Sequence, residues 1–86
     1  MDLEARLLSL GQDLALRTAA ETLDEYLDLV RAGEYGVALE ILCDRLDDAQ
    51  APLLRSDVEV IQALAREMQL DRPSIAFIRD LIPEGE

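Results

Sequence analysis

Carboxylates are the side chains of this sequence that could do chemistry, and they recur one helical turn apart. Asp24 and Asp28 are separated by four residues, as are Glu40 and Asp44. Two neighbouring carboxylates can act as general acid and general base when their surroundings separate their pKa values. Here both pairs fall on polar helical faces opposite the apolar residues, where water gives all four groups similar surroundings. The pattern favours a solvated surface, and we expect no enzyme.

The other side chains that commonly carry catalysis or bind metals are missing. The sequence has no His and no Lys, which leaves no imidazole base, no Schiff-base lysine and no histidine ligand. Asp44, Asp47 and Asp48 lie close together, but they lack the alternation, the glycine and the terminal Glu of an EF-hand loop. Cys43 has no base to activate its thiol, and its place beside Leu42 predicts a small buried apolar side chain. We therefore expect no cofactor and no metal.

A carrier domain with a modified serine is a further class of small acidic helical protein. Such a serine should begin a helix within an Asp-Ser-Leu sequence. Ser56 lies between Arg55 and Asp57, and Ser9 lies between two leucines, so neither site fits. Ser56 followed three residues later by Glu59 instead predicts a capping box at the start of a helix.

Length and charge restrict the kind of protein further. The chain has 86 residues, of which 19 are acidic and eight are basic, all of them Arg, for a net charge of −11. Phosphate backbones and anionic membrane surfaces repel such a chain, so we expect no direct binding to nucleic acid or membrane. Half of the residues are apolar, which is typical of a folded domain rather than a disordered acidic tail. The acidic start and the lack of a long apolar run favour a cytoplasmic protein.

Apolar residues recur at helical spacing in five segments. The expected helices cover residues 3–14, 19–31, 35–46, 57–68 and 73–82, with a loop over 47–54. Thr18 with Glu21 predicts a capping box before the second helix, and Gly33 is placed as the glycine that ends it. Pro73 suits the first position of the last helix.

The short connection around Gly33 predicts that the second and third helices pair as an antiparallel helical hairpin. No segment shows the alternation of a strand, and no linker is long enough to divide the chain. The predicted fold is therefore all-α, a compact bundle of about five helices with a central hairpin, forming one domain over residues 1–86.

The acidic residues gather on the outer faces of this predicted hairpin. In the paired helices they are Glu21, Asp24, Glu25, Asp28, Glu40, Asp44, Asp47 and Asp48. Merged into one broad surface, they would speed association with a basic partner. Tyr35, at the start of a helix, is an aromatic candidate for the interface, whereas Tyr26 lies on the apolar stripe and is expected in the core. The candidate partner-binding residues are Asp24, Asp28, Tyr35, Glu40, Asp44, Asp47 and Asp48.

The hairpin segment also resembles a known family. The resemblance is carried, in order, by Gly33-Glu34-Tyr35-Gly36, Ala38-Leu39-Glu40, Leu42-Cys43-Asp44 and Val60-Ile61-Gln62-Ala63-Leu64-Ala65. Over residues 20–72 this pattern resembles the MafI family of small immunity proteins. The resemblance implies a cytoplasmic antitoxin that binds one cognate toxin domain of a bacterial polymorphic or contact-dependent toxin system and blocks it. Toxins of such systems are frequently nucleases, whose basic clefts would suit an acidic partner.

The residues of this motif also have structural explanations. Gly33, Gly36 and Ala38 suit a helical hairpin, and Leu39 and Leu42 suit its core, so we expect partner contacts from the charged faces instead. A helical adaptor or homo-oligomerisation module without inhibitory role is the alternative. The apolar stripes leave no surplus for a large homodimer interface, and we expect a monomer when no partner is bound.

Overall fold

The computed structural model describes residues 2–84, and within this range the chain is helical and contains no strand. The helices are α1 (Leu3–Leu14), α2 (Ala20–Arg31), α3 (Tyr35–Ala49), α4 (Arg55–Glu67) and α5 (Pro73–Ala76), followed by a 3₁₀ turn at Ile78–Leu81. The all-α class and the number of helices predicted from the sequence are confirmed. Among these helices none is long and apolar enough to cross a membrane.

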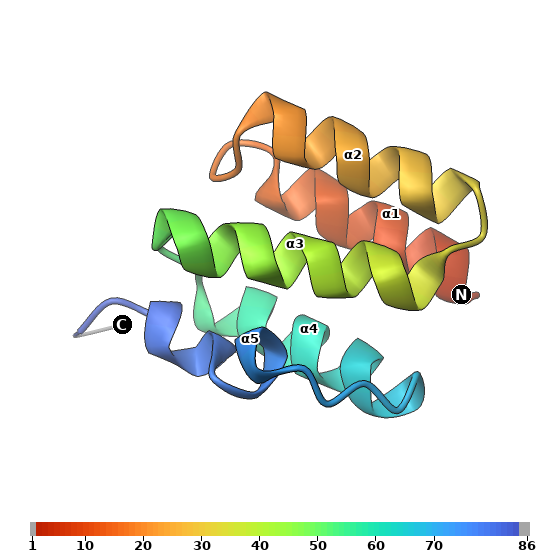
Figure 1. Cartoon of the computed structure of the whole chain (residues 1–86). Coiled ribbons are helices and arrows are strands. Elements are labelled where there is room, and N and C mark those ends of the chain that lie inside the picture. Colours follow the sequence, from red (N-terminus) through yellow and green to blue (C-terminus); the bar gives the residue numbers. More distant parts are fainter. Residues whose placement is uncertain (1, 85–86) are drawn as a thin grey trace.

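The four long helices form a ring in which consecutive helices run in opposite directions (Figure 1). Helix α2 packs against α1 and α3, and α4 packs against the same two helices from the other side. The short α5 and the 3₁₀ turn cover the side where α3 meets α4. The ring is an up-and-down bundle, and α2 with α3 is the antiparallel hairpin expected from the sequence.

The turn of the hairpin is built around a left-handed glycine. Gly33 has φ +82°, and its amide donates to the carbonyl of Val30 at 3.0 Å. The amide of Glu34 donates to the carbonyl of Leu29 at 2.9 Å, which completes a Schellman motif. The last carbonyls of α2 are thus satisfied, and the chain reverses within three residues to begin α3.

Replacing this glycine should destabilise the protein although there is room for a side chain. A Cβ on Gly33 would meet nothing within 4 Å, so Gly33→Ala is expected to lose about 1 kcal/mol from backbone strain alone. Gly36, in the first turn of α3, is the matched control. Its φ is unexceptional and its Cβ would lie 3.4 Å from the Leu70 side chain, so Gly36→Ala should stay within about 0.5 kcal/mol. Urea unfolding of both variants tests this, and equal losses would contradict it.

The core lies inside the ring, and Tyr26 is one of its largest side chains. The ring of Tyr26 is fully buried, and its hydroxyl donates to the carbonyl of Leu7 on α1 at 2.7 Å. Gly11 allows α1 and α2 to approach closely here, since a Cβ at this position would lie 3.3 Å from both Tyr26 and Leu27. Cys43 is also buried in the core, as expected.

The two capping boxes predicted at helix starts are wrong. Because α2 begins at Ala20, Thr18 precedes the N-cap residue Ala19 and is one residue too early for a capping box. Helix α4 begins at Arg55, before Ser56, because Asp57 caps the first turn by accepting a hydrogen bond from the amide of Leu54 at 3.0 Å.

The expected loop at residues 47–54 is shorter than predicted. Helix α3 continues through Asp47 and Asp48 to Ala49 and stops at Gln50, which has φ +50°. Its apolar pattern ends before the helix does, and residues 47–49 are exposed, which is why periodicity missed the last turn. The predicted last helix also divides at Phe77 into α5 and the 3₁₀ turn.

Candidate partner-binding surface

Four of the candidate residues lie exposed along the hairpin. Asp24 and Asp28 project from the outer side of α2, and Asp47 and Asp48 lie in the last turn of α3. These carboxylates have no basic side chain paired with them in the described residues 2–84. They are therefore accessible to a basic partner.

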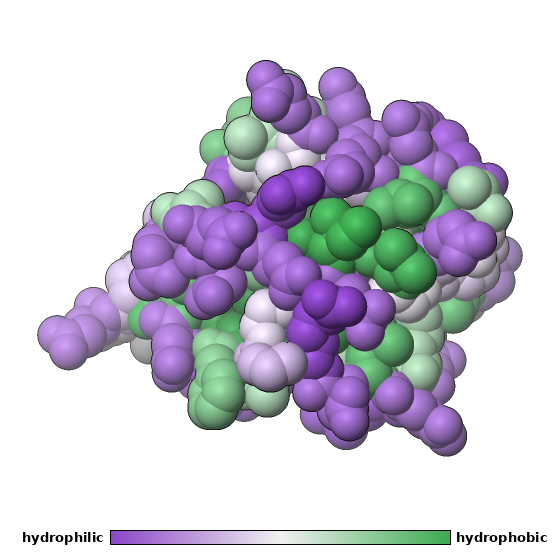
Figure 2. Space-filling view, in the orientation of Figure 1, coloured by the Kyte–Doolittle hydropathy of each residue, from purple (hydrophilic) through white to green (hydrophobic). Residues whose placement is uncertain are grey.

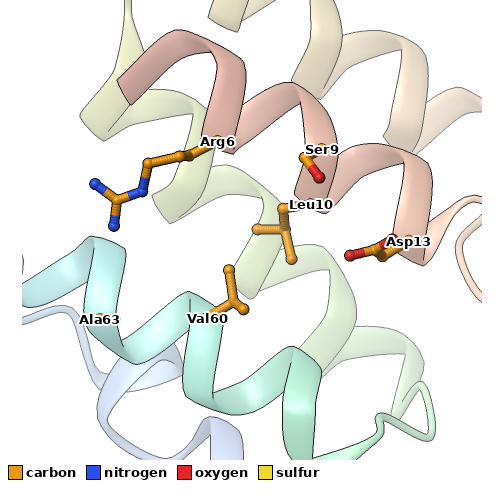
Figure 3. Close-up of a pocket in the computed structure, with 6 residues that line it drawn as sticks. All are labelled: Arg6, Ser9, Leu10, Asp13, Val60 and Ala63. Carbon is orange, nitrogen blue, oxygen red and sulfur yellow. The ribbon is translucent and has the colours of Figure 1, made fainter. Parts of the chain in front are cut away.

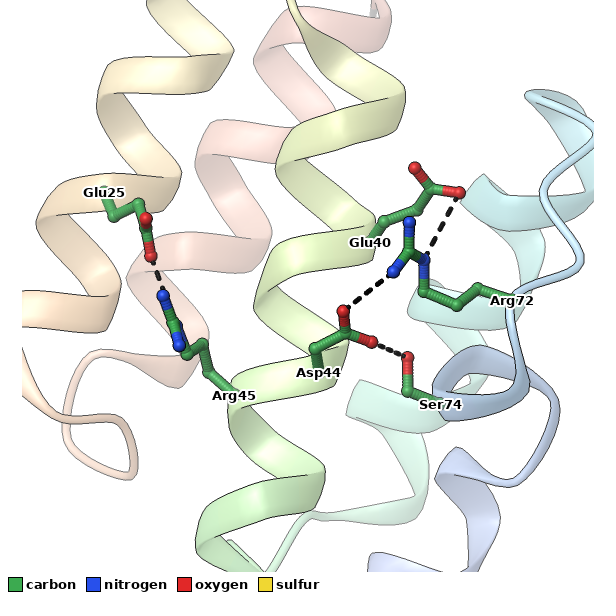
Figure 4. A network of polar contacts seen from close by, with 6 residues as sticks. All are labelled: Glu25, Glu40, Asp44, Arg45, Arg72 and Ser74. Atoms are coloured by element: carbon green, nitrogen blue, oxygen red, sulfur yellow. Dashed lines mark hydrogen bonds and ion pairs between the residues drawn. The ribbon is translucent and has the colours of Figure 1, made fainter.

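An ion pair lies at the seam between the two helices. The Nε of Arg45 on α3 lies 3.4 Å from Oε1 of Glu25 on α2 (Figure 4). Both side chains are about half exposed, so the pair contributes little to stability. The pair is important for the charge of the surface, because the Arg45 guanidinium interrupts the broad acidic surface that the sequence predicted.

Glu40 and Asp44 are partly exposed and paired with a basic side chain, whereas the sequence predicted a fully solvated acidic face here. The segment after α4 folds back over α3, so that Nε of Arg72 lies 3.6 Å from Glu40 and its Nη1 3.0 Å from Asp44. The hydroxyl of Ser74 donates to the other oxygen of Asp44 at 2.6 Å (Figure 4). The two carboxylates together bind the guanidinium of Arg72, and both side chains are only partly exposed. The periodicity of α3 could not reveal this contact, because its partners lie 28 or more residues further along the chain.

Tyr35 is also engaged within the molecule. Its hydroxyl donates to Oε1 of Glu4, in the first turn of α1, at 2.8 Å. The Glu4 carboxylate that accepts this hydrogen bond raises the pKa of Tyr35, and desolvation adds to the effect. The contact ties the start of α3 to the start of α1, so the partly exposed Tyr35 links these two helices.

The structure adds an apolar feature that sequence reasoning missed. Val37, which is 42% exposed, and the partly exposed Ile41 lie one turn apart on α3, and Leu29 on α2 is partly exposed as well. The space-filling view in Figure 2 shows an apolar area over α3 and the adjoining part of α2, bordered by polar side chains. In the sequence, Val37 and Ile41 are next to the core residues Ala38 and Leu42, so they resemble the edge of an apolar stripe. The four-residue spacing that they share with Glu40 and Asp44 is the signal that could have placed them on the outer side.

A hollow of about 240 Å³ lies between α1 and α4, away from this apolar area. Leu10 and Val60 face each other across it, with Arg6 at one end and Asp13 at the other (Figure 3). The ion pair between Arg6 and Glu67 joins these two helices as well, and Arg17, in the connection after α1, pairs with Asp57 on α4. Helices α1 and α4 together carry five carboxylates and three arginines, whereas residues 20–49 carry nine carboxylates and two arginines. Negative charge is thus concentrated on the hairpin.

The arrangement defines a class of protein rather than a particular member: a small all-α bundle with an acidic hairpin face. Within residues 2–84 no group of three His, Cys, Asp or Glu side chains is placed to hold a metal ion. No family model, no curated protein and no solved structure matches the chain.

Proposed function

We propose that this protein is an immunity protein that binds a basic toxin domain and inhibits it by covering its surface. The toxin belongs to a bacterial polymorphic or contact-dependent system, and a nuclease is the class that fits best. The observation that carries the proposal is the concentration of negative charge on the hairpin, since residues 20–49 hold nine carboxylates against two arginines. The same hairpin carries most of the sequence pattern that resembles the MafI family, and the rest of that pattern lies in α4.

The electrostatics suit inhibition of a protein that binds nucleic acid. A cleft that accepts phosphates is lined by Arg and Lys, and an acidic surface attracts and covers such a cleft. An interface of standard size takes about 800 Å² from each partner. The described protein exposes 5146 Å², so an interface of that size occupies about a sixth of it.

The direct test is protection of cells. The gene immediately upstream of the one for this protein is cloned as a source of the toxin domain, and growth is measured with and without co-expression. Growth should be restored only when this protein is present. A lack of protection, or self-association of the purified protein at micromolar concentration with no toxin bound, would favour the adaptor alternative.

Reversing charges on the hairpin should slow binding. Asp47→Arg with Asp48→Arg changes the charge by four units at exposed positions, and we expect association with the toxin domain to slow about tenfold at low salt and to depend less on salt. Glu59→Arg with Asp80→Arg, also exposed but outside the hairpin, makes the same change in net charge. Stopped-flow kinetics should show a much smaller effect for this control. Equal slowing would mean that net charge, and not the hairpin, steers the encounter.

A further inference from the structure

We propose that the partner docks on the hairpin face centred on Val37 and Ile41, with an apolar side chain of the partner over these two residues and arginines or lysines around it. This inference rests on the proposed function and names the surface through which it acts. The face consists of Leu29, Glu34, Val37, Glu40, Ile41 and Asp44, with Asp28 at its edge.

The centre of the face is apolar, and its side chains project from helices that are held in place by the core. Val37 and Ile41 project from the same side of α3, and the inner side of that helix is anchored by the fully buried Ala38 and Leu42. The Schellman turn at Gly33 fixes α2 beside it. An apolar contact on such elements is ordered before binding, so little conformational entropy is lost in forming the complex.

The rim of the face is acidic, and it already holds one guanidinium group of the protein itself. Glu40 and Asp44 hold Arg72 on one side of the apolar centre, and outside the face Glu25 pairs with Arg45 in the same way. Asp28 and Glu34 are exposed and have no basic side chain paired with them among the described residues. The spacing of the rim therefore suits guanidinium groups, and a partner with cations around an apolar residue is complementary to it.

The other exposed apolar side chains lack this combination. Val60, at 40% exposure, belongs to the hollow between α1 and α4, where Arg6 and other arginines balance most of the acidic side chains. Leu16, Leu54 and Phe77 are more exposed, but each lies in a short connection and is close in sequence to an arginine, namely Arg17, Arg55 and Arg79 respectively. A basic partner therefore has its best apolar contact at Val37.

The test compares two valines of equal exposure. Val37→Asp and Val60→Asp place the same new charge on the outside of a helix, at 42% and 40% exposed positions. Position 37 lies in the first turn of α3, where an Asp is favourable, so the variant should fold. The probe is the purified toxin domain from the upstream gene, with binding measured by surface plasmon resonance and folding by thermal melting.

We expect Val37→Asp to weaken binding about 30-fold, chiefly by faster dissociation, and Val60→Asp to change it less than threefold. The sign is informative, because an interface made by charge alone would bind a basic domain more tightly after Val37→Asp. Tighter binding, or a larger loss with Val60→Asp, overturns the docking surface while leaving the proposed function in place. If the wild-type protein does not bind the toxin domain, the proposed function itself has failed. Self-association of the wild type that Val37→Asp abolishes would assign the surface to a second copy of the chain and also overturn the inference.

Discussion

Between pH 8 and pH 11 the protein is expected to lose about 4 kcal/mol of its free energy of unfolding. Two buried groups, the thiol of Cys43 and the phenol of Tyr26, must stay protonated in the folded core. Burial raises the pKa of Cys43 from an ordinary 9.0 to about 12, and the nearby carboxylate of Asp44 adds to the shift. Burial, followed by the proximity of Cys43, raises the pKa of Tyr26 far above its ordinary 10.0.

The direction of the effect follows from proton binding. Between pH 9 and pH 12 the unfolded chain releases the Cys43 proton and the folded chain keeps it, so rising pH stabilises the unfolded state. The same holds for Tyr26 from pH 10 upward. At pH 11 the linkage relation gives a loss of about 4 kcal/mol from the two groups together, and Cys43 contributes the larger part because its unfolded-state pKa is the lower of the two. This is a large part of the roughly 5 kcal/mol that stabilises a domain of this size.

The composition makes this measurement unusually direct. The sequence has no Lys and no His, and its Arg side chains stay charged, so Cys43, Tyr26 and Tyr35 are the side chains that titrate in this range. Urea unfolding of the wild type, Cys43→Ala and Tyr26→Phe at half-unit pH steps gives the slope of stability against pH. Each variant starts less stable at pH 8, but its slope should be shallower than that of the wild type. Parallel slopes would show that neither buried group controls alkaline unfolding.

Much of the fold could be predicted from the sequence, because the apolar residues that recur at helical spacing are the ones that lie in the core. Residues 3–14 and 20–31 form helices whose apolar stripes face inward, and Gly33 needs the left-handed conformation that its place in the sequence suggested. Tyr26 and Cys43 lie in the core for the same reason. These predictions depend on contacts within a turn or two of helix, and such contacts follow directly from periodicity.

The candidate surface was harder to predict, because it depends on contacts between distant parts of the chain. Glu40 and Asp44 have the spacing of a solvated acidic face, yet the return of the chain after α4 brings Arg72 and Ser74 onto them. Val37 resembles a core residue in sequence and is 42% exposed in the structure. Which side of a helix stays open is decided by the packing of the other helices, and periodicity alone does not give this arrangement.

The residues that resemble a family and the residues proposed to contact a partner are interleaved along the hairpin. Gly33, Ala38, Leu39 and Leu42 shape the turn or lie in the core, whereas Val37 and Ile41 lie between them on the outer side. On such a scaffold the outer residues can be substituted while the residues of the core and the turn stay the same. Under the proposed function, substitutions at positions 37 and 41 and in the acidic rim are expected to change partner choice without disturbing the turn or the core.

Replacing Asp57 by Ala is expected to lower the free energy of unfolding by about 3 kcal/mol. Its carboxylate is 5% exposed, pairs with Nη2 of Arg17 and accepts a hydrogen bond from the amide of Leu54. One side chain thereby caps α4 and ties it to the chain that leaves α1. Ala at this position removes the cap and leaves the guanidinium of Arg17, itself 28% exposed, without its carboxylate.

The ion pair between Arg6 and Glu67 provides the control, because it joins the same two parts of the bundle at the surface. Its side chains are 34% and 52% exposed, so Glu67→Ala should lose no more than about 0.5 kcal/mol. Asp57→Asn, which keeps an acceptor for Leu54 but loses the charge, should fall between the two. In the double variant Arg17→Ala with Asp57→Ala no unpaired charge remains, so its loss should be smaller than the sum of the single losses. Strict additivity, or equal losses for Asp57→Ala and Glu67→Ala, would mean that burial does not strengthen this contact and that α4 is held to α1 by apolar packing alone.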